Sequence, residues 1–213
     1  MRHATILALF VVLPAVARQV DTDAWRGRSL GIAVYPDAGL TLSTAGTEII
    51  TGATGGGVDA SGRLIPPGME PPALRIANAL ATLAHEHYGM IDAPRVPARH
   101  LDAPKDLARS AREVANVDVV LDVEANAGVT QNLFRSSFGV GMLVTARLID
   151  VQTGKTLASS FCQQISKGAW SREELMANDA EKLKAAVAER ADGCIEKFKA
   201  SVLMIKPRDP GSN

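Results

Sequence analysis

The order of apolar and polar positions predicts a strand near the start of the chain and a long loop after it. Residues 28–35 (RSLGIAVY) are rich in β-branched and aromatic side chains, and this run ends at a Pro-Asp turn signal. Residues 41–69 contain repeated glycines and little apolar content outside 48–50. We therefore expect a strand at 28–35 and a glycine-rich surface loop at 41–69.

Two helical patterns follow this loop. Residues 71–88 begin with two prolines and return apolar side chains to one face, and Gly89 supplies a helix stop. A second pattern occupies 102–114, with Asp102 as a candidate N-cap. Between the two helices, 90–96 predicts only an edge strand because prolines interrupt it.

Three apolar runs in the second half of the chain predict an antiparallel meander. Residues 117–123 alternate between apolar and polar positions, as a strand with one buried face does. The runs 138–151 and 156–163 flank Gly154, where a short hairpin loop needs positive φ. We expect the three runs to pair in sequence order, with the connection 124–137 exposed.

The carboxy-terminal segment has the most regular helical period. Apolar residues recur every three or four positions from Met176 to Val202, which predicts one long amphipathic helix without a break. Ser171 and Glu174 have the spacing of a capping box at its start. The elements together predict the α/β (α+β) class: a mixed, mainly antiparallel sheet packed by two to three helices.

The amino terminus predicts export. Arg2 precedes an apolar run that ends at the small residues Ala15 and Ala17, which is the layout of a cleavable signal peptide. The run is shorter than the roughly 20 apolar residues that a transmembrane helix needs. We expect cleavage between Ala17 and Arg18, no later span of transmembrane length, and no lipidation because no cysteine lies near this point.

The two cysteines, Cys162 and Cys194, both lie in the predicted exported part. An oxidising compartment favours their pairing, and closing this loop would contribute roughly 3 to 4 kcal/mol. Cys162 ends the last predicted strand and Cys194 lies on the apolar stripe of the last helix, so a helix packed across the sheet can bring them together. Two buried thiols are the alternative, and a redox-active pair lacks the Cys-x-x-Cys spacing.

Domain layout and charge follow from these elements. We divide the chain into a signal peptide (1–17), a linker (18–27), a single domain (28–205) and a disordered tail (206–213). Lysine plus arginine and aspartate plus glutamate both total 23, so the surplus of cations that nucleic acid binding requires is missing.

Candidate catalytic groups lack the spacing that known sites use. His85 and His87 are two positions apart on a predicted helix, so their rings point in different directions, unlike the pair in a His-Glu-x-x-His zinc site. His100 has no sequence partner, and the glycines at 52–57 lack the Gly-Lys-Ser/Thr ending of a phosphate-binding loop. We therefore expect neither an enzyme nor a cofactor.

Three carboxylates, Asp118, Asp122 and Glu124, share one face of the predicted strand at 117–123 and just beyond it, and could hold a hard cation. Same-face neighbours are about 7 Å apart along a strand, too far to converge on one ion. Arg147 on the neighbouring run could neutralise them, and we favour this role over metal binding.

The segments VDVVLDV (117–123) and LVTARLIDVQTGK (143–155) resemble the central hairpin of a broad group of bacterial envelope proteins. This group includes the curli-secretion lipoprotein CsgG, the penicillin-binding-protein activator LpoB and relatives of the TolB amino-terminal domain. The resemblance implies an α/β sandwich and a non-catalytic role in assembly or regulation at the cell envelope. The glycine-rich loop and both cysteine positions are similar to those of exported members of this group with no assigned role. Without a lipobox cysteine or a matching channel-forming or synthase-contacting segment, neither secretion nor cell-wall activation is carried over.

The leading hypothesis is a periplasmic, non-enzymatic interaction module that serves assembly or regulation of the cell envelope. Its candidate interaction loop comprises Gly55, Gly56 and Gly57 with Phe134 in the connection 124–137, and its expected partner is another envelope protein. Homo-oligomerisation stays open. The alternatives are a binder of a small ligand, with a pocket beneath the glycine-rich loop, and a hydrolase with an unrecognised site.

Overall fold

A computed structural model of the chain describes residues 21–35, 40–43, 63–64, 66, 68–99, 102–114, 116–131, 137–166 and 170–206. Its elements are a short 3-10 helix (Asp23–Trp25), β1 (Ser29–Val34), β2 (Leu40–Ser43), β3 (Arg63–Leu64), α1 (Pro72–Tyr88), β4 (Ile91–Asp92), β5 (Val96–Pro97), α2 (Pro104–Val114), β6 (Val119–Gln131), β7 (Phe138–Asp150), β8 (Thr156–Ile165) and α3 (Arg172–Ser201).

Strand β6 is the centre of the sheet. On one side it pairs antiparallel with β7, which pairs antiparallel with β8. On its other side, β1 pairs in parallel with the first part of β6, and β2 pairs in parallel with its last part. The short strands β4 and β5 extend the sheet beyond β1, also in parallel, and β3 pairs antiparallel with β2. The sheet is therefore mixed, with its longest pairings antiparallel.

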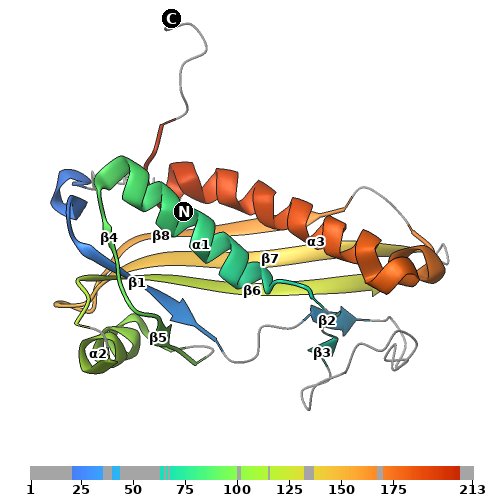
Figure 1. Cartoon of the computed structure of the whole chain (residues 1–213), viewed down its shortest axis with the longest axis horizontal. Coiled ribbons are helices and arrows are strands. Elements are labelled where there is room, and N and C mark those ends of the chain that lie inside the picture. The colour runs from blue at the N-terminus through green and yellow to red at the C-terminus, as the bar shows by residue number, and fades with distance from the viewer. Residues whose placement is uncertain are drawn as a thin grey trace, which may run out of the picture.

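Helices cover the two faces of this sheet unequally. Helices α1 and α3 lie side by side along one face, which we call the inner face, whereas the shorter α2 lies near one end on the opposite, outer face (Figure 1). On β7 the inner-face side chains are almost fully buried: Val140, Met142, Val144, Ala146 and Leu148. A second, smaller core under α2 includes Val120 and Ile149 on the outer face.

Most expected elements are present, and the predicted fold class is confirmed. The meander has the expected order, and its hairpin places Gly154 at φ 65°. Helix α1 stops at Gly89, which has φ 61°, and the capping box of Ser171 and Glu174 at the start of α3 is complete. These elements have local signals strong enough to be found without tertiary information.

Two expected loops contain strands. Strand β6 continues to Gln131, so the predicted exposed connection 124–137 is wrong over its first part. The alternation of apolar inner positions simply continues through the small residues Ala125 and Ala127 to Val129. The predicted loop 41–69 also contains most of β2, which pairs with the far end of β6, and all of β3, which pairs with β2.

Two helix details also differ from the sequence predictions. The long last helix has non-helical backbone at Ala177, and Asn178, Asp179 and Ala180 have positive φ, so it is kinked near its start. Helix α2 begins at Pro104, and the Asp102 carboxylate accepts a hydrogen bond from the Arg99 amide (2.9 Å), which places it in the preceding turn rather than as the helix cap.

Of the helices in the described ranges, none combines the length and apolar character that a membrane crossing would require.

Candidate binding surface

The outer face of the sheet carries polar and exposed apolar side chains beyond the edge of α2. Strand alternation sends Asp122 and Glu124 of β6, Leu143 and Arg147 of β7, and Phe161 of β8 to this face, because their neighbours fill the inner core. This face divides into a buried polar network next to α2 and an apolar patch farther along the strands.

The polar network joins β1, β6 and β7. The Arg147 guanidinium donates through Nε to Asp122 Oδ2 (2.6 Å) and through Nη2 to Glu124 Oε1 (3.1 Å). The Tyr35 hydroxyl donates to Asp122 and also lies within 3.2 Å of Glu124 Oε1. The Asp122 side chain is only 1% exposed, so its charge depends on these donors for compensation.

The surroundings raise the pKa of two members of this network, Tyr35 and Arg147. Burial raises the pKa of the Tyr35 hydroxyl far above its ordinary value, and the neighbouring Asp122 carboxylate raises it further. For Arg147, burial lowers the pKa, but the Asp122 and Glu124 carboxylates outweigh it and the net pKa is raised. A tyrosine that stays protonated and an arginine that stays charged suit a structural clamp rather than acid–base catalysis.

The third predicted carboxylate lies apart from this network. Asp118 accepts hydrogen bonds from the Ser29 amide (2.8 Å) and hydroxyl (2.7 Å) at the start of β1. Arg147 has the neutralising role predicted for it, toward Asp122 and Glu124. Within the described ranges, no group of three or more histidine, cysteine, aspartate or glutamate side chains is arranged to hold a metal ion.

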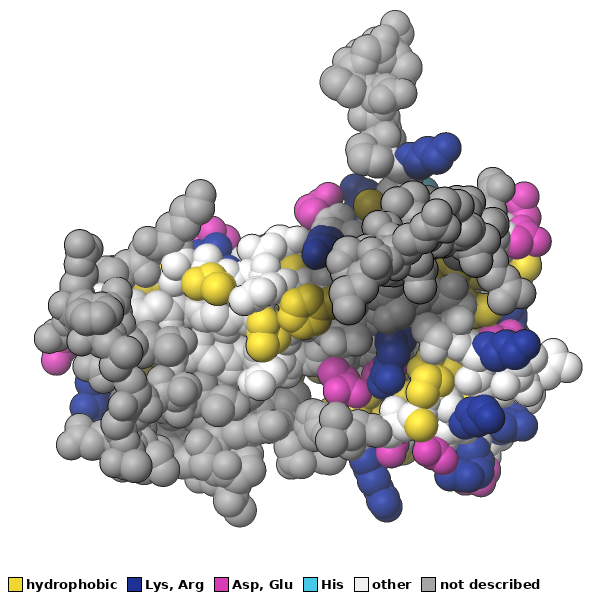
Figure 2. All heavy atoms as spheres, turned by 180° about the vertical axis from the view of Figure 1, so that it is seen from behind, with side chains coloured by type: hydrophobic (Ala, Val, Ile, Leu, Met, Phe, Trp, Pro, Cys, Tyr) yellow, Lys and Arg dark blue, Asp and Glu magenta, His cyan; other side chains and the backbone are white. Residues whose placement is uncertain are grey.

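Three large hydrophobic side chains on the outer face are exposed to solvent, and we call them the outer apolar patch. Leu143 of β7 is 43% exposed, and Phe161 and Ile165 of β8 are 50% and 65% exposed. From behind the molecule, hydrophobic side chains stand out on the sheet among polar side chains and backbone (Figure 2). Large apolar groups gathered on the part of a sheet face that lies beyond its covering helix, here α2, are typical of a binding surface.

A groove of about 890 Å³ lies beside α2 and β5. Its charged lining consists of three arginines and three carboxylates: Arg95, Arg99, Arg109, Asp102, Asp106 and Glu113. Arg109 pairs with Asp106 inside this lining. Positive and negative side chains are therefore equal in number in this groove. A pocket was expected beneath the glycine-rich loop, but most of that loop lies outside the described residues.

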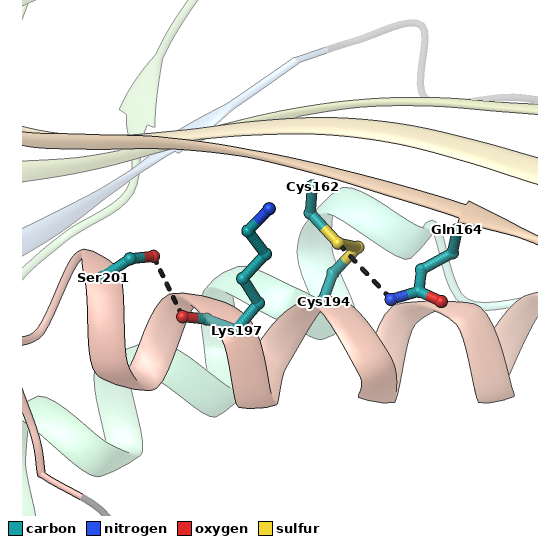
Figure 3. The surroundings of a disulfide bond; sticks show 5 residues. All are labelled: Cys162, Gln164, Cys194, Lys197 and Ser201. Atoms are coloured by element: carbon teal, nitrogen blue, oxygen red, sulfur yellow. Dashed lines mark hydrogen bonds between the residues drawn. A yellow bond between two sulfur atoms is a disulfide. The ribbon is translucent and has the colours of Figure 1, made fainter.

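The predicted disulfide between Cys162 of β8 and Cys194 of α3 is present, and both residues are fully buried. Figure 3 shows the bridge between the strand and the helix, with the Gln164 amide 3.8 Å from the Cys162 sulfur. The Gln164 side chain also lies against Gly193, where an added Cβ would be 3.0 Å from the amide nitrogen. The disulfide and this close approach fix α3 on the inner face behind the outer apolar patch.

The remaining candidate residues are dispersed or outside the described ranges. His85 Nδ1 lies 2.9 Å from the Met90 carbonyl oxygen at the end of α1. His100, the predicted cleavage residues Ala15, Ala17 and Arg18, the candidate interaction loop of Gly55, Gly56, Gly57 and Phe134, and the tail 207–213 lie outside the described residues.

Sequence reasoning missed Tyr35 and the outer apolar patch. The available signal for the patch was that β8 has large apolar residues at Phe161 and Ile165, out of phase with the buried Ala158 and Cys162. Apolar residues of both phases predict a strand with two apolar faces. The signal for Tyr35 was weaker, because its partners come from strands far along the chain.

No protein-family model matches the chain, and the search of curated proteins finds no match. Among solved structures, it is similar to protein XCC0632 from Xanthomonas campestris, of family DUF330, with 15% identity over 85% of this chain and 88% of that chain and a TM-score of 0.37. It is also similar to the PelC dodecamer from Paraburkholderia phytofirmans, with 19% identity over 78% of this chain and 85% of that one and a TM-score of 0.31.

A third similar structure is the LpoB C-terminal domain from Salmonella enterica, with 12% identity over 65% of this chain and 84% of that chain and a TM-score of 0.27. LpoB is one of the proteins in the resemblance predicted from sequence, whereas these comparisons give no support to the CsgG and TolB parts of it.

Proposed function

We propose that this chain is an exported, non-enzymatic protein of the bacterial periplasm that binds a partner protein of the envelope through its outer apolar patch. The observation that carries the proposal is the exposure of Leu143, Phe161 and Ile165 on one sheet face. Burying such side chains against a partner contributes on the order of 25 cal/mol per Å² of apolar surface.

The disulfide supports the periplasmic part of the proposal. Cys162 and Cys194 are both buried and bonded, and such pairs persist in oxidising compartments. The predicted signal peptide at 1–17, with the domain 28–205 as the mature fold, belongs to the same proposal.

The polar network supports a non-enzymatic role. Its carboxylates are compensated by Arg147 and Tyr35 within the protein, and burial keeps the Tyr35 hydroxyl protonated. The groove beside α2 has charges of both signs in equal number, so we place partner binding ahead of small-ligand binding.

A photocrosslinking amino acid introduced at Leu143 tests the proposal in cells. We expect a discrete crosslinked product between this chain and another envelope protein, and the same probe at Glu196, an exposed position of α3 on the other side of the sheet, should give none. Equal crosslinking from the two positions, or no product from Leu143, would contradict the proposed surface.

A further inference from the structure

The edge of the sheet at β8 has the features of a pairing site. Among the described strands, β8 pairs with β7 alone, so its second backbone edge has no strand beside it. The strand has ten residues (TLASSFCQQI) and contains neither a charged residue nor a proline. Edge strands that stay unpaired usually carry such residues, because a long uncharged edge recruits another strand.

The backbone groups that would form this pairing can be identified. The Ser166 amide donates to the Val140 carbonyl of β7 (2.9 Å), and antiparallel strands alternate the direction of these groups. The backbone amides and carbonyls of the even-numbered residues of β8 therefore face β7. The amides and carbonyls of Ser159, Phe161 and Gln163 point away from β7, and their side chains lie on the outer face.

We propose that two copies of this chain associate by antiparallel pairing of their β8 strands about a two-fold axis at Phe161. In this register Phe161 lies opposite its own copy, and Ser159 of each copy lies opposite Gln163 of the other. Apolar side chains of one copy thus lie opposite apolar side chains of the other, and polar opposite polar, as a self-complementary two-fold interface requires. With no charge in β8, the pairing opposes no like charges along the strand.

The helices leave room for this arrangement. Helix α3 packs on both β7 and β8. Strands in a sheet lie about 4.8 Å apart, so pairing the two β8 strands would set the two α3 helices roughly 10 Å apart, an ordinary helix packing distance. The two sheets would then become one, and the two outer apolar patches would join. This inference goes beyond the proposed partner binding and does not depend on it.

Charge variants at the outward positions test the pairing and its register. The variant Ser159→Lys with Gln163→Lys places like charges opposite each other twice in the dimer, and we expect about a tenfold or greater weakening of association. The matched variant Ser159→Lys with Gln163→Glu uses the same positions but opposes unlike charges, and should dimerise as the unaltered chain does. Sedimentation over a concentration series reads out the association.

A mixing experiment adds the decisive control. A double glutamate variant at the same two positions should also be monomeric alone, and should form a mixed dimer with the double lysine variant. Circular dichroism and the absence of titratable thiols would establish that each variant is folded and oxidised. A monomeric wild-type chain, or a double lysine variant that dimerises like the wild type, would overturn the pairing.

Gln163 lies opposite Leu143 on the outer face, so crosslinking from Leu143 is compared between the double lysine variant and the matched lysine–glutamate variant. Loss of self-association in the double lysine variant alone, with crosslinking from Leu143 retained in both, separates this inference from the proposed partner binding. If the charge variants fold poorly, Gln163→Pro serves instead, because it removes an amide that points away from β7. This variant should be folded and monomeric, and a folded dimer would contradict the pairing.

Discussion

At the scale of single residues, the buried network around Asp122 ties three strands together. Asp122 is 1% exposed, and its charge is compensated by Arg147 across the β6–β7 pairing and by Tyr35 at the end of β1. The sequence indicated the Arg147 contact because the two residues lie on paired strands. It gave no comparable signal for Tyr35, whose position depends on how β1 is inserted beside β6.

Replacing Arg147 with methionine should destabilise the protein by about 3 kcal/mol or more, because a buried carboxylate loses its compensating charge. Urea unfolding measures the change. Arg109→Met removes an arginine from an exposed pair with Asp106 and should cost less than about 1 kcal/mol. Similar losses from the two variants would show that the Asp122 network is not the clamp described above.

At the scale of elements, local signals predicted the helix ends and the hairpin. Long-range pairing determined the strands β2 and β3 and the position of the outer apolar patch. Gly89, Gly154 and the capping box act within a few residues, so they can be read from the sequence. Strand β2 pairs with the backbone edge at the far end of β6, and β3 in turn pairs with β2. The outer apolar patch is likewise defined by which face the helices leave open.

The kink in α3 could not be predicted from the hydrophobic period. Ala180 and Leu183 keep their apolar spacing and are buried, although three successive residues have left-handed backbone. Left-handed backbone costs roughly 1 kcal/mol for each residue other than glycine. The burial of both ends of the helix against the sheet is what compensates for this local cost.

Glycine substitutions distinguish this kink from a continuous helix. Asp179 is exposed with φ 54°, so Asp179→Gly should raise the unfolding free energy, by up to about 1 kcal/mol. Ala185→Gly, at an exposed position of regular helix, should instead lower it by about 1 kcal/mol. Thermal unfolding would detect the opposite signs, and a loss of stability in both variants would argue for an unbroken helix.

At the scale of the whole molecule, polar contacts at the start of β1 connect segments that are far apart in the chain. Arg28 donates to the Asp150 carboxylate (2.7 Å), and Ser29 donates to Asp118 across a separation of 89 residues. Hydrogen bonds from the Ser29 amide and hydroxyl lower the pKa of Asp118 below its ordinary value of 3.8. This junction joins β1, β6 and the β7–β8 hairpin.

The junction should contribute to acid unfolding. Because the folded pKa of Asp118 lies below its unfolded value, its contribution to stability is fully present above the unfolded pKa. It is lost as the pH falls through the folded pKa, so the change begins near about pH 4 and continues below it. In Asp118→Asn this part of the pH dependence should disappear from the unfolding free energy, and an unchanged acid profile would contradict the assignment.

The central place of β6 sets an order for folding. Strand β1 ends at Val34 and β2 at Ser43, far before β6 begins at Val119, and both strands pair with β6. Until β6 has been synthesised, β1 can pair only with the two-residue strands β4 and β5, and β2 only with the two-residue strand β3, so we expect the sheet to form late. Cys162 and Cys194 come later still in the chain, so we expect their bond to form after β1 has paired with β6.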